Sequence, residues 1–166
     1  MQYISHYNSP LGKILLAADN VGLSGLWFEN QKYYAMNLDK NHEEKDLPIF
    51  EITKKWLDIY FSGLEPTYMP ELHLSLIGTD FQISVWRSLL QVPYGTTITY
   101  SEIAEKISNK TCARAVGNAV SRNPISIIIP CHRVVSSNGK LTGYAGGIDK
   151  KLNLLELEKI DTKNYI

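Results

Sequence analysis

The residues of this sequence best suited to covalent chemistry are Cys131 and the two that follow it, His132 and Arg133. A thiol reacts as its thiolate, and a nearby histidine or arginine can accept the thiol proton or stabilise the anion. Buried, unreactive cysteines are also common in globular proteins. The residue types alone therefore leave two interpretations open, a nucleophile and a packed core residue.

The chain has one other cysteine, Cys112, and two cysteines are too few for a disulfide framework. Neither cysteine belongs to a spaced His or Cys pair of the kind that binds zinc. The N-terminal half has no cysteine, and its histidines form no ligand pattern: His6, His42 and His73. We therefore predict at least one free thiol and no metal.

The segment before Cys131 predicts how the thiol is positioned. Residues 125–129 read Ile-Ser-Ile-Ile-Ile, which is β-branched and too short for a helix. We expect a buried strand here, with Cys131 at its end.

Two short helices are expected upstream of this segment. A capping-box pattern at Thr99 opens a helix through about Ile107, and residues 108–110 link it to a second helix over residues 111–122. Two short helices with a tight connection have the outline of a helix-turn-helix. The second helix carries small side chains at Ala113, Ala115, Gly117, Ala119 and Ser121. Small residues suit either the approach of a large flat partner or tight internal packing, and the sequence leaves both open.

The first part of the chain has the pattern of a small α/β unit. Strands are expected over residues 2–8, 12–18 and 22–29, which turn-forming residues separate into an antiparallel meander. An acidic loop is expected over residues 39–46, followed by a helix that carries Ile52, Trp56, Ile59 and Tyr60 on one face and ends at Ser62 and Gly63. We expect this helix to cover the sheet.

A change in composition near residue 78 marks the predicted domain boundary. A proline-containing connector over residues 65–70 precedes it, and a capping box at Thr79 then opens a helix over residues 81–90. The sequence therefore predicts two domains, residues 1–78 and residues 79–166.

Charge is sorted between these two parts although the net charge is zero. Residues 1–79 carry six Lys and Arg against ten Asp and Glu, whereas residues 80–166 carry eleven against seven. A basic face on the second part would suit nucleic acid. No stretch approaches the roughly 18 apolar residues of a membrane span, and the N-terminus lacks the form of a signal peptide. We expect a cytoplasmic protein that does not bind a membrane.

Several segments of the second part resemble one known family when they are taken together. The string Ile129-Pro130-Cys131-His132-Arg133-Val134 looks like the active-site signature of the O6-alkylguanine-DNA alkyltransferases, or methylated-DNA–protein-cysteine methyltransferases. The other matching segments, in the family's order and approximate spacing, are residues 99–104, 113–119, 122–124 and 143–147, with Leu154, Leu155 and Glu158. The first part resembles the family only in its strand-strand-strand-helix outline, including Ser9-Pro10-Leu11-Gly12.

This resemblance implies both a fold and an activity. The fold is an N-terminal α/β domain, ribonuclease-H-like, with a helix and a three-stranded antiparallel sheet, followed by a mostly α C-terminal domain with a winged helix-turn-helix. The activity is direct-reversal DNA repair, in which Cys131 takes the alkyl group from O6 of guanine, with O4-alkylthymine as a further candidate substrate. The thioether product is stable, so each molecule acts once and no cofactor is needed.

The resemblance also assigns roles around Cys131. His132 is the expected base for the thiol, Glu158 orients the imidazole, and Tyr100 donates to the leaving guanine. Ala145 departs from the serine found in some relatives, which bears on the alkyl groups that fit the pocket.

The expected partner is double-stranded DNA that contains O6-alkylguanine. The family binds the minor groove, where sequence is poorly distinguished, and rotates the target base out of the stack. Arg114 is expected to fill the gap, and the protein to act as a monomer. The other residues expected at the DNA or the substrate are Thr99, Ala113, Ala115, Gly117, Asn123, Tyr144, Ala145 and Gly146.

Two other functions compete with repair. A thiol hydrolase would also use Cys131 and His132, but such enzymes draw these residues from separate segments and need an oxyanion loop, which the sequence lacks. A module that binds lesions without repairing them would share every DNA-binding feature. The fate of Cys131 separates this module from a transferase.

Overall fold

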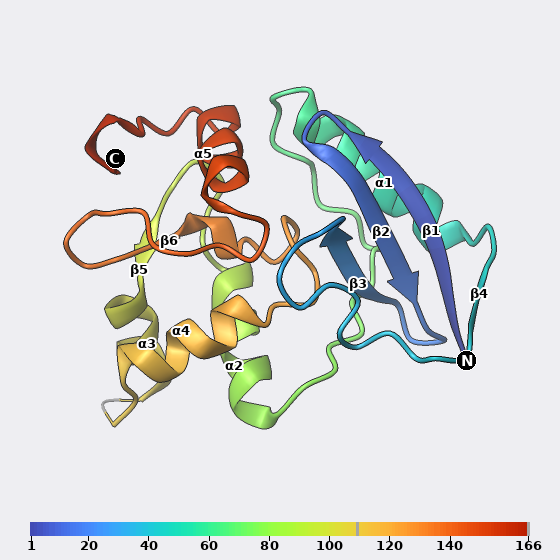
Figure 1. Ribbon diagram of the computed structural model, residues 1–166, viewed down its shortest axis with the longest axis horizontal. Helices are drawn as coiled ribbons and strands as arrows, with labels where there is room; N and C mark the ends of the chain where they lie inside the picture. Colours follow the sequence, from blue (N-terminus) through green and yellow to red (C-terminus); the bar gives the residue numbers. More distant parts are fainter. Residues whose placement is uncertain (109, 166) are drawn as a thin grey trace.

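The computed structural model describes residues 1–108 and 110–165, so Asn109, in the predicted link between two short helices, lies outside the described residues. A sheet with one helix forms the N-terminal half, and helices dominate the C-terminal half (Figure 1). The N-terminal elements are β1 (Gln2–Ser9), β2 (Gly12–Ala18), β3 (Leu23–Phe28), β4 (His42–Glu44) and α1 (Pro48–Phe61). The C-terminal elements are α2 (Asp80–Leu90), β5 (Ile98–Thr99), α3 (Tyr100–Ile107), α4 (Ala113–Ser121), the 3-10 turn η1 (Cys131–Arg133), β6 (Val134–Val135), α5 (Ile148–Leu157) and η2 (Lys163–Tyr165).

The N-terminal sheet has the strand order β3-β2-β1-β4. The predicted antiparallel meander is confirmed for β1, β2 and β3. The predicted loop over residues 39–46 is wrong in part, because β4 lies within it and pairs in parallel with β1, His42 opposite Gln2. Every residue of β4 is exposed, so this strand carries no hydrophobic pattern that sequence analysis could detect. Besides the backbone pairing, Glu44 contacts His6 of β1 at 3.3 Å.

Both faces of the sheet are covered, which explains the almost wholly apolar β2. Helix α1 packs on one face through Phe50, Leu57 and Tyr60. On the other face, Trp27 packs with residues of the segment that follows β3, including Leu38. A Cβ at position 25 would lie 2.0 Å from the Trp27 ring, so only glycine fits beneath the indole.

Helix α1 begins at Pro48 and ends where the sequence predicted, at Ser62 and Gly63. Pro48 occupies its first turn, where the missing N–H costs nothing. The amide of Ser62 bonds back to the last turn, and Gly63 then leaves the helix with a φ of 89°. This end places Tyr60 at the boundary between the two halves.

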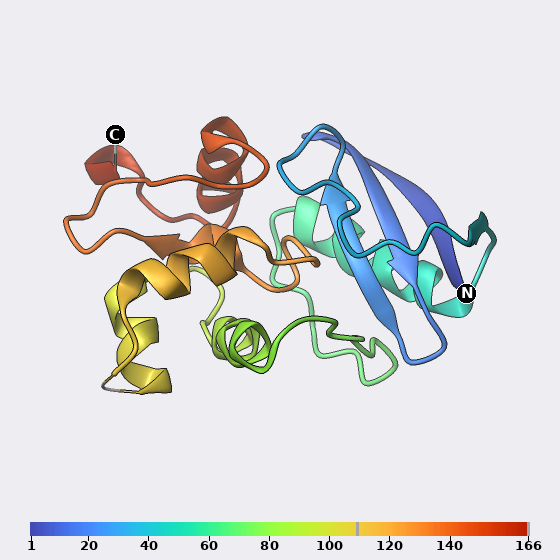
Figure 2. The same cartoon turned by 60° about the horizontal axis from the view of Figure 1, so that its bottom comes forward.

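Helix α2 begins with the complete capping box predicted at Thr79, in which the side chains of Thr79 and Gln82 each accept from the other's backbone N–H. At the start of α3, Thr99 caps Glu102 N, but the Glu102 carboxylate accepts from the Thr99 hydroxyl, so only half of the expected box forms. Helices α3 and α4 follow one another, as predicted, and pack with α2 (Figure 2).

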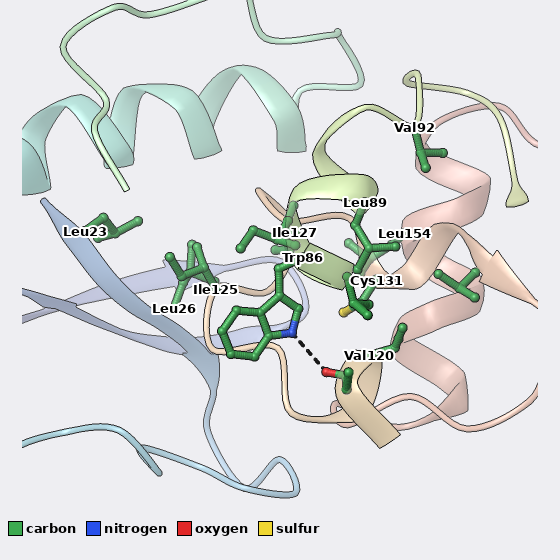
Figure 3. Close-up of a cluster of buried hydrophobic side chains, with 14 of the residues drawn as sticks. Leu23, Leu26, Trp86, Leu89, Val92, Val120, Ile125, Ile127, Cys131 and Leu154 are labelled. Carbon is green, nitrogen blue, oxygen red and sulfur yellow. Dashed lines mark hydrogen bonds between the residues drawn. The ribbon is translucent and has the colours of Figure 1, made fainter. Parts of the chain in front are cut away.

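One buried apolar cluster runs through both halves. Leu23 and Leu26 of β3 belong to the same cluster as Trp86 of α2 and Ile125. Cys131 belongs to it as well and lies beside Leu89 and Leu154 (Figure 3). The Trp86 indole N–H donates to the carbonyl of Ala119 in α4 at 2.9 Å. The sheet, α2 and α4 are thereby packed around the segment that leads to Cys131.

The expected fold class is confirmed, with an N-terminal α/β part and a mostly helical C-terminal part. The C-terminal part also has a small parallel sheet of β5 and β6. Among the described residues, no helix has the length and apolar character needed to cross a bilayer.

Candidate active site

Cys131 lies at the start of η1 and is almost fully buried, with 4% of its surface exposed. It contributes to the wall of a cavity of about 540 Å³, a size typical of small-molecule sites. The other lining residues are Lys32, Tyr100, Ser101, Ala113, Arg114, Gly117, Val120, Ser121, Ser136, Ser137, Thr142, Gly143, Tyr144 and Ala145. The thiol is therefore buried within the protein yet faces a space that a substrate can enter.

The strand predicted over residues 125–129 is wrong. The segment forms consecutive turns, with a single bridge from Ile125 to Leu26 of β3, and Ile127 has a left-handed φ of 72°. A β-branched residue tolerates such a backbone only where its surroundings fix it. Pairing with the N-terminal sheet supplies that restraint, and residues so distant in sequence give no local pattern.

Asn123 holds this turn closed. Its side-chain amide donates to the carbonyl of Ile129 at 2.8 Å, and its side-chain oxygen accepts from Ile125 N at 3.0 Å. The side chain is buried, so its bonds are made away from water. Asn123 thus fixes the backbone that leads directly to Cys131.

We expect Asn123→Ala to lower the free energy of unfolding by about 1–3 kcal/mol, because it leaves a buried carbonyl and a buried N–H unsatisfied. Urea denaturation followed by fluorescence measures this loss. Asn153→Ala, in which only an exposed amide bond is removed, is the matched control and should change stability little. A loss no larger in Asn123→Ala than in this control would contradict the role.

Glu158, at the end of α5, is the centre of a buried hydrogen-bond network. Its Oε2 accepts from His132 Nε2 at 2.5 Å, and its Oε1 accepts from Arg133 Nε at 2.8 Å and from Gly95 N at 3.0 Å. The Glu158 and His132 side chains have no exposed surface. The pairing that the family resemblance implied between these two residues is present in the structure.

The pKa shifts of these groups set the charges of the resting site, with a neutral thiol and a neutral imidazole beside an ionised carboxylate. Burial raises the pKa of Cys131, so the thiol carries its proton in the resting protein. Burial lowers the pKa of His132 against the opposing effect of Glu158, so the imidazole is neutral. Despite burial, hydrogen bonds from His132 and Arg133 hold the pKa of Glu158 down at about 2, so it is ionised.

This charge state defines which imidazole nitrogen can act. His132 donates its Nε2 proton to the Glu158 carboxylate, which leaves Nδ1 with a free lone pair. Nδ1 is buried and has no hydrogen-bond partner among the residues the structure describes. The arrangement can accept one proton at Nδ1 and balance the resulting charge with Glu158.

Lys151 is a site residue that sequence reasoning missed. Its side chain is fully buried on α5, and its Nζ donates to the carbonyls of Val134 at 2.6 Å and Thr142 at 2.9 Å. Burial lowers its pKa to about 8, against the opposing effect of Cys131. The spacing of Lys151 with Leu154, Leu155 and Glu158 matches one helix face, which was the available clue.

Tyr100 and Tyr144 are the aromatic residues of the cavity. The Tyr100 hydroxyl accepts from Thr142 Oγ1 at 3.1 Å, and burial raises its pKa, so it keeps a proton to donate. Burial also raises the pKa of Tyr144, whose hydroxyl is buried. Gly117 of α4 lies against the Tyr100 ring, where a Cβ would make an ordinary van der Waals contact at 3.7 Å.

The cavity brings together most, but not all, of the residues expected from the sequence. Those that line it are Tyr100, Ala113, Arg114, Gly117, Cys131, Tyr144 and Ala145. Those outside its lining are Thr99, Ala115, Asn123, His132, Gly146 and Glu158. Lys32 was not expected: it comes from the N-terminal half, where its backbone N–H donates to the Ala145 carbonyl at 2.9 Å.

No group of three or more His, Cys, Asp or Glu side chains is arranged to hold a metal ion within residues 1–108 and 110–165. Cys112 is exposed, directly precedes α4 and does not line the cavity. Cys131 is thus the thiol that joins a cavity to a histidine–carboxylate pair.

The fold and the site together define a protein with a buried thiol, next in sequence to a histidine–carboxylate pair, beside a substrate-sized cavity and a pair of short helices. Comparison with known sequences makes the class specific. Residues 2–70 match the ribonuclease-like domain of 6-O-methylguanine DNA methyltransferase, and residues 80–160 match the DNA binding domain of the same family. The chain belongs to the O6-alkylguanine-DNA alkyltransferase family, whose members repair DNA by moving an alkyl group onto one of their own cysteines.

Individual relatives agree along nearly the whole chain. The methylated-DNA–protein-cysteine methyltransferase of Methanosarcina acetivorans is 46% identical over 94% of this chain and 97% of its own length. That of Haemophilus influenzae is 41% identical over 95% of this chain and 87% of its own length. The structure of Mycobacterium tuberculosis OGT in complex with DNA superposes with a TM-score of 0.85 at 43% identity, covering 95% of this chain and 93% of that one.

Proposed function

We propose that this chain removes the alkyl group from O6 of guanine in double-stranded DNA and that Cys131 is the cysteine that receives it. The observation that carries this assignment is the position of Cys131, at once in the wall of the cavity and next to His132, which Glu158 holds by a hydrogen bond. Cys112 has neither property. Each protein molecule repairs one lesion and is then inactive, and the reaction needs no cofactor.

The first step is proton transfer from the thiol. His132 takes the Cys131 proton at Nδ1 through a bridging water, and Glu158 stabilises the imidazolium through Nε2. Burial raises the pKa of Cys131, and the ammonium of Lys151 favours the thiolate because its positive charge offsets part of that rise. The buried thiol of Cys131, which is protonated in the resting protein, thus becomes a nucleophile only where the His132–Glu158 pair and Lys151 are in place.

The second step is displacement at the alkyl carbon. The Cys131 sulfur forms a bond to this carbon while the bond from the carbon to guanine O6 breaks, and the electron pair stays on guanine. Tyr100 donates a hydrogen bond to a ring nitrogen of the leaving base, where negative charge grows. The proton gained by guanine balances the proton lost by the thiol, so the products are unmodified guanine and S-alkylcysteine.

Access to the cavity requires that the base leave the helix, since a stacked guanine hides its O6 atom. Helix α4 lies along the cavity with small residues, and Arg114 is exposed beside it. We place α4 in the minor groove, with Arg114 filling the space left by the flipped nucleotide. Thr99, Ala113, Ala115 and Gly117 line this contact.

The remaining substrate contacts fall on the far wall. Tyr144 and Ala145 surround the alkyl group, and Gly146 supports them from behind the Tyr144 ring. Asn123 acts through the turn that it closes rather than by touching the base. We further assign residues 1–78 and 79–166 to two domains, with the protein acting as a cytoplasmic monomer.

Intact-mass measurement tests the assignment. The purified protein is mixed with duplex DNA that contains one O6-methylguanine, and peptide fragmentation then locates any added mass. We expect one methylene unit of added mass per molecule on Cys131, none in Cys131→Ala, and normal labelling in Cys112→Ala. Tight binding of the lesion without added mass would overturn alkyl transfer to Cys131 and favour a module that only binds lesions.

A further inference from the structure

We propose that Tyr60, on α1 in the N-terminal half, is a positioning residue for alkyl transfer: its hydroxyl shares the carboxylate of Glu158 with His132. The inference rests on the proposed roles of Cys131 and His132. It assigns the N-terminal half a direct part in the chemistry of a cysteine that lies in the other half.

The contact is short and buried. The Tyr60 hydroxyl donates to Glu158 Oε2 at 2.6 Å, and the same oxygen accepts from His132 Nε2 at 2.5 Å. The Tyr60 oxygen lies 3.3 Å from His132 Nε2, so the three side chains meet at one point. The Tyr60 side chain has no exposed surface, and water cannot easily replace its hydroxyl.

Tyr60 completes the hydrogen bonding of the carboxylate. A carboxylate has about four acceptor positions, and Glu158 receives four donors, two on each oxygen. Three come from Gly95, His132 and Arg133 in the C-terminal half, and the fourth is Tyr60. Removal of the phenol therefore leaves one buried acceptor position empty, on the oxygen that faces His132.

Sharing Oε2 has a definite effect on His132. A hydrogen bond donated to a carboxylate reduces the negative charge that the carboxylate presents to its other partners. Tyr60 therefore weakens the attraction between Glu158 and an imidazolium at His132. Tyr60 thus helps to keep His132 neutral in the resting protein while it fixes the direction of the Glu158 carboxylate. A neutral, aligned imidazole is the form that can accept the thiol proton.

The other groups around this point do not replace Tyr60. Arg133 faces Glu158 on Oε1, Lys151 acts on His132 from α5, and Tyr94 lies near Glu158 with a hydroxyl that has no hydrogen-bond partner among the described residues. Burial and Glu158 raise the pKa of Tyr60, so it remains a donor throughout the range in which proteins are folded.

The ring of Tyr60 can be kept while its hydroxyl is removed. The ring stacks on Trp56 with centroids 5.5 Å apart and meets Tyr94 and His132 edge-on at 6.2 Å and 6.3 Å. Tyr60→Phe preserves these contacts, so it tests the hydrogen bond rather than the packing. Tyr94→Phe is the matched control, since it removes a buried hydroxyl that makes no hydrogen bond within the part of the chain that the structure describes.

A second control removes a hydrogen bond of the same kind, from a phenol to a carboxylate, elsewhere on the same helix. The Tyr7 hydroxyl donates to Asp58 Oδ1 of α1, also at 2.6 Å, but at an exposed position. Tyr7→Phe therefore breaks a phenol–carboxylate bond of equal length away from His132. Any effect that comes only from loosening α1 will appear in this variant as well.

The experiment is single-turnover methyl transfer from duplex DNA with one O6-methylguanine, measured against pH together with DNA affinity. Because one hydrogen bond to a charged group is lost, we expect the acid limb of the rate profile to move up by roughly one pH unit in Tyr60→Phe. The rate below that limb falls about tenfold as a result. The DNA affinity of Tyr60→Phe should match that of the parent protein. The controls Tyr94→Phe and Tyr7→Phe should match the parent in both DNA affinity and the dependence of the rate on pH.

The outcomes separate this inference from the proposal on which it rests. If the parent protein transfers no methyl group to Cys131, the proposed function fails. If the parent reacts and Tyr60→Phe keeps its rate and pH profile, or changes only as Tyr94→Phe and Tyr7→Phe do, the role of Tyr60 is overturned. A slowing explained by weaker DNA binding overturns it too.

Discussion

Glu158→Gln is expected to destabilise the protein by about 3–5 kcal/mol at neutral pH and to slow methyl transfer by roughly 100-fold or more. The substitution removes the negative charge that pairs with Arg133 in a buried position and that supports an imidazolium at His132. An unpaired buried charge costs more than the pair contributes, which is why the expected loss is large. Urea denaturation and single-turnover kinetics measure the two effects.

The destabilisation should depend on pH in a defined direction. The pKa of Glu158 is lowered from 4.5 to about 2 in the folded protein. The stability that its charge contributes is fully present above 4.5 and is lost as the pH falls toward about 2. The difference between the parent and Glu158→Gln should shrink in that window, whereas Glu156→Gln, an exposed neighbour on α5, should differ little from the parent at any pH. A difference that stays constant through the window would contradict the assigned charge state.

Arg114→Ala is expected to reduce methyl transfer from duplex DNA by roughly 10- to 100-fold, because nucleotide flipping costs a few kcal/mol and Arg114 is assigned to offset part of that cost. The same variant should react nearly normally with a single-stranded oligonucleotide, in which no base pair must open. The ratio of the two single-turnover rates is the decisive quantity.

A matched variant separates flipping from general attraction to DNA. Arg87→Ala removes an exposed arginine of α2 that does not line the cavity, so it should lower both rates together or neither. Equal losses on duplex and single-stranded substrates in Arg114→Ala would leave Arg114 as an ordinary phosphate contact.

Local chemistry made much of the fold predictable. The capping box at Thr79 and the helix end at Gly63 follow from side-chain and backbone preferences that act over a few residues, and both are present. The three-stranded meander follows from alternating turns and apolar runs in the same way. Strand β4 could not be predicted, since its residues are exposed and carry no hydrophobic pattern.

Contacts between distant segments set the limit of sequence reasoning at the site. The turn over residues 125–129 depends on Leu26 and on Asn123, and its β-branched composition pointed to a strand instead. Tyr60 was expected on a helix face that covers the sheet, which is correct, but nothing in its sequence surroundings indicates Glu158. The pair of His132 and Glu158 entered only through the family resemblance.

The single apolar cluster shared by the two halves has a consequence for the cooperativity of unfolding. Leu26 of β3 exchanges backbone hydrogen bonds with Pro124 and Ser126, at 2.8 Å and 3.0 Å, directly beside the turn that carries Cys131. Separating the halves would break these hydrogen bonds and expose apolar side chains of the shared cluster, among them Leu26 and Trp86, to water (Figure 3). We therefore expect the protection of the turn before Cys131 against hydrogen exchange and proteolysis to follow the global stability of the chain rather than local fluctuations.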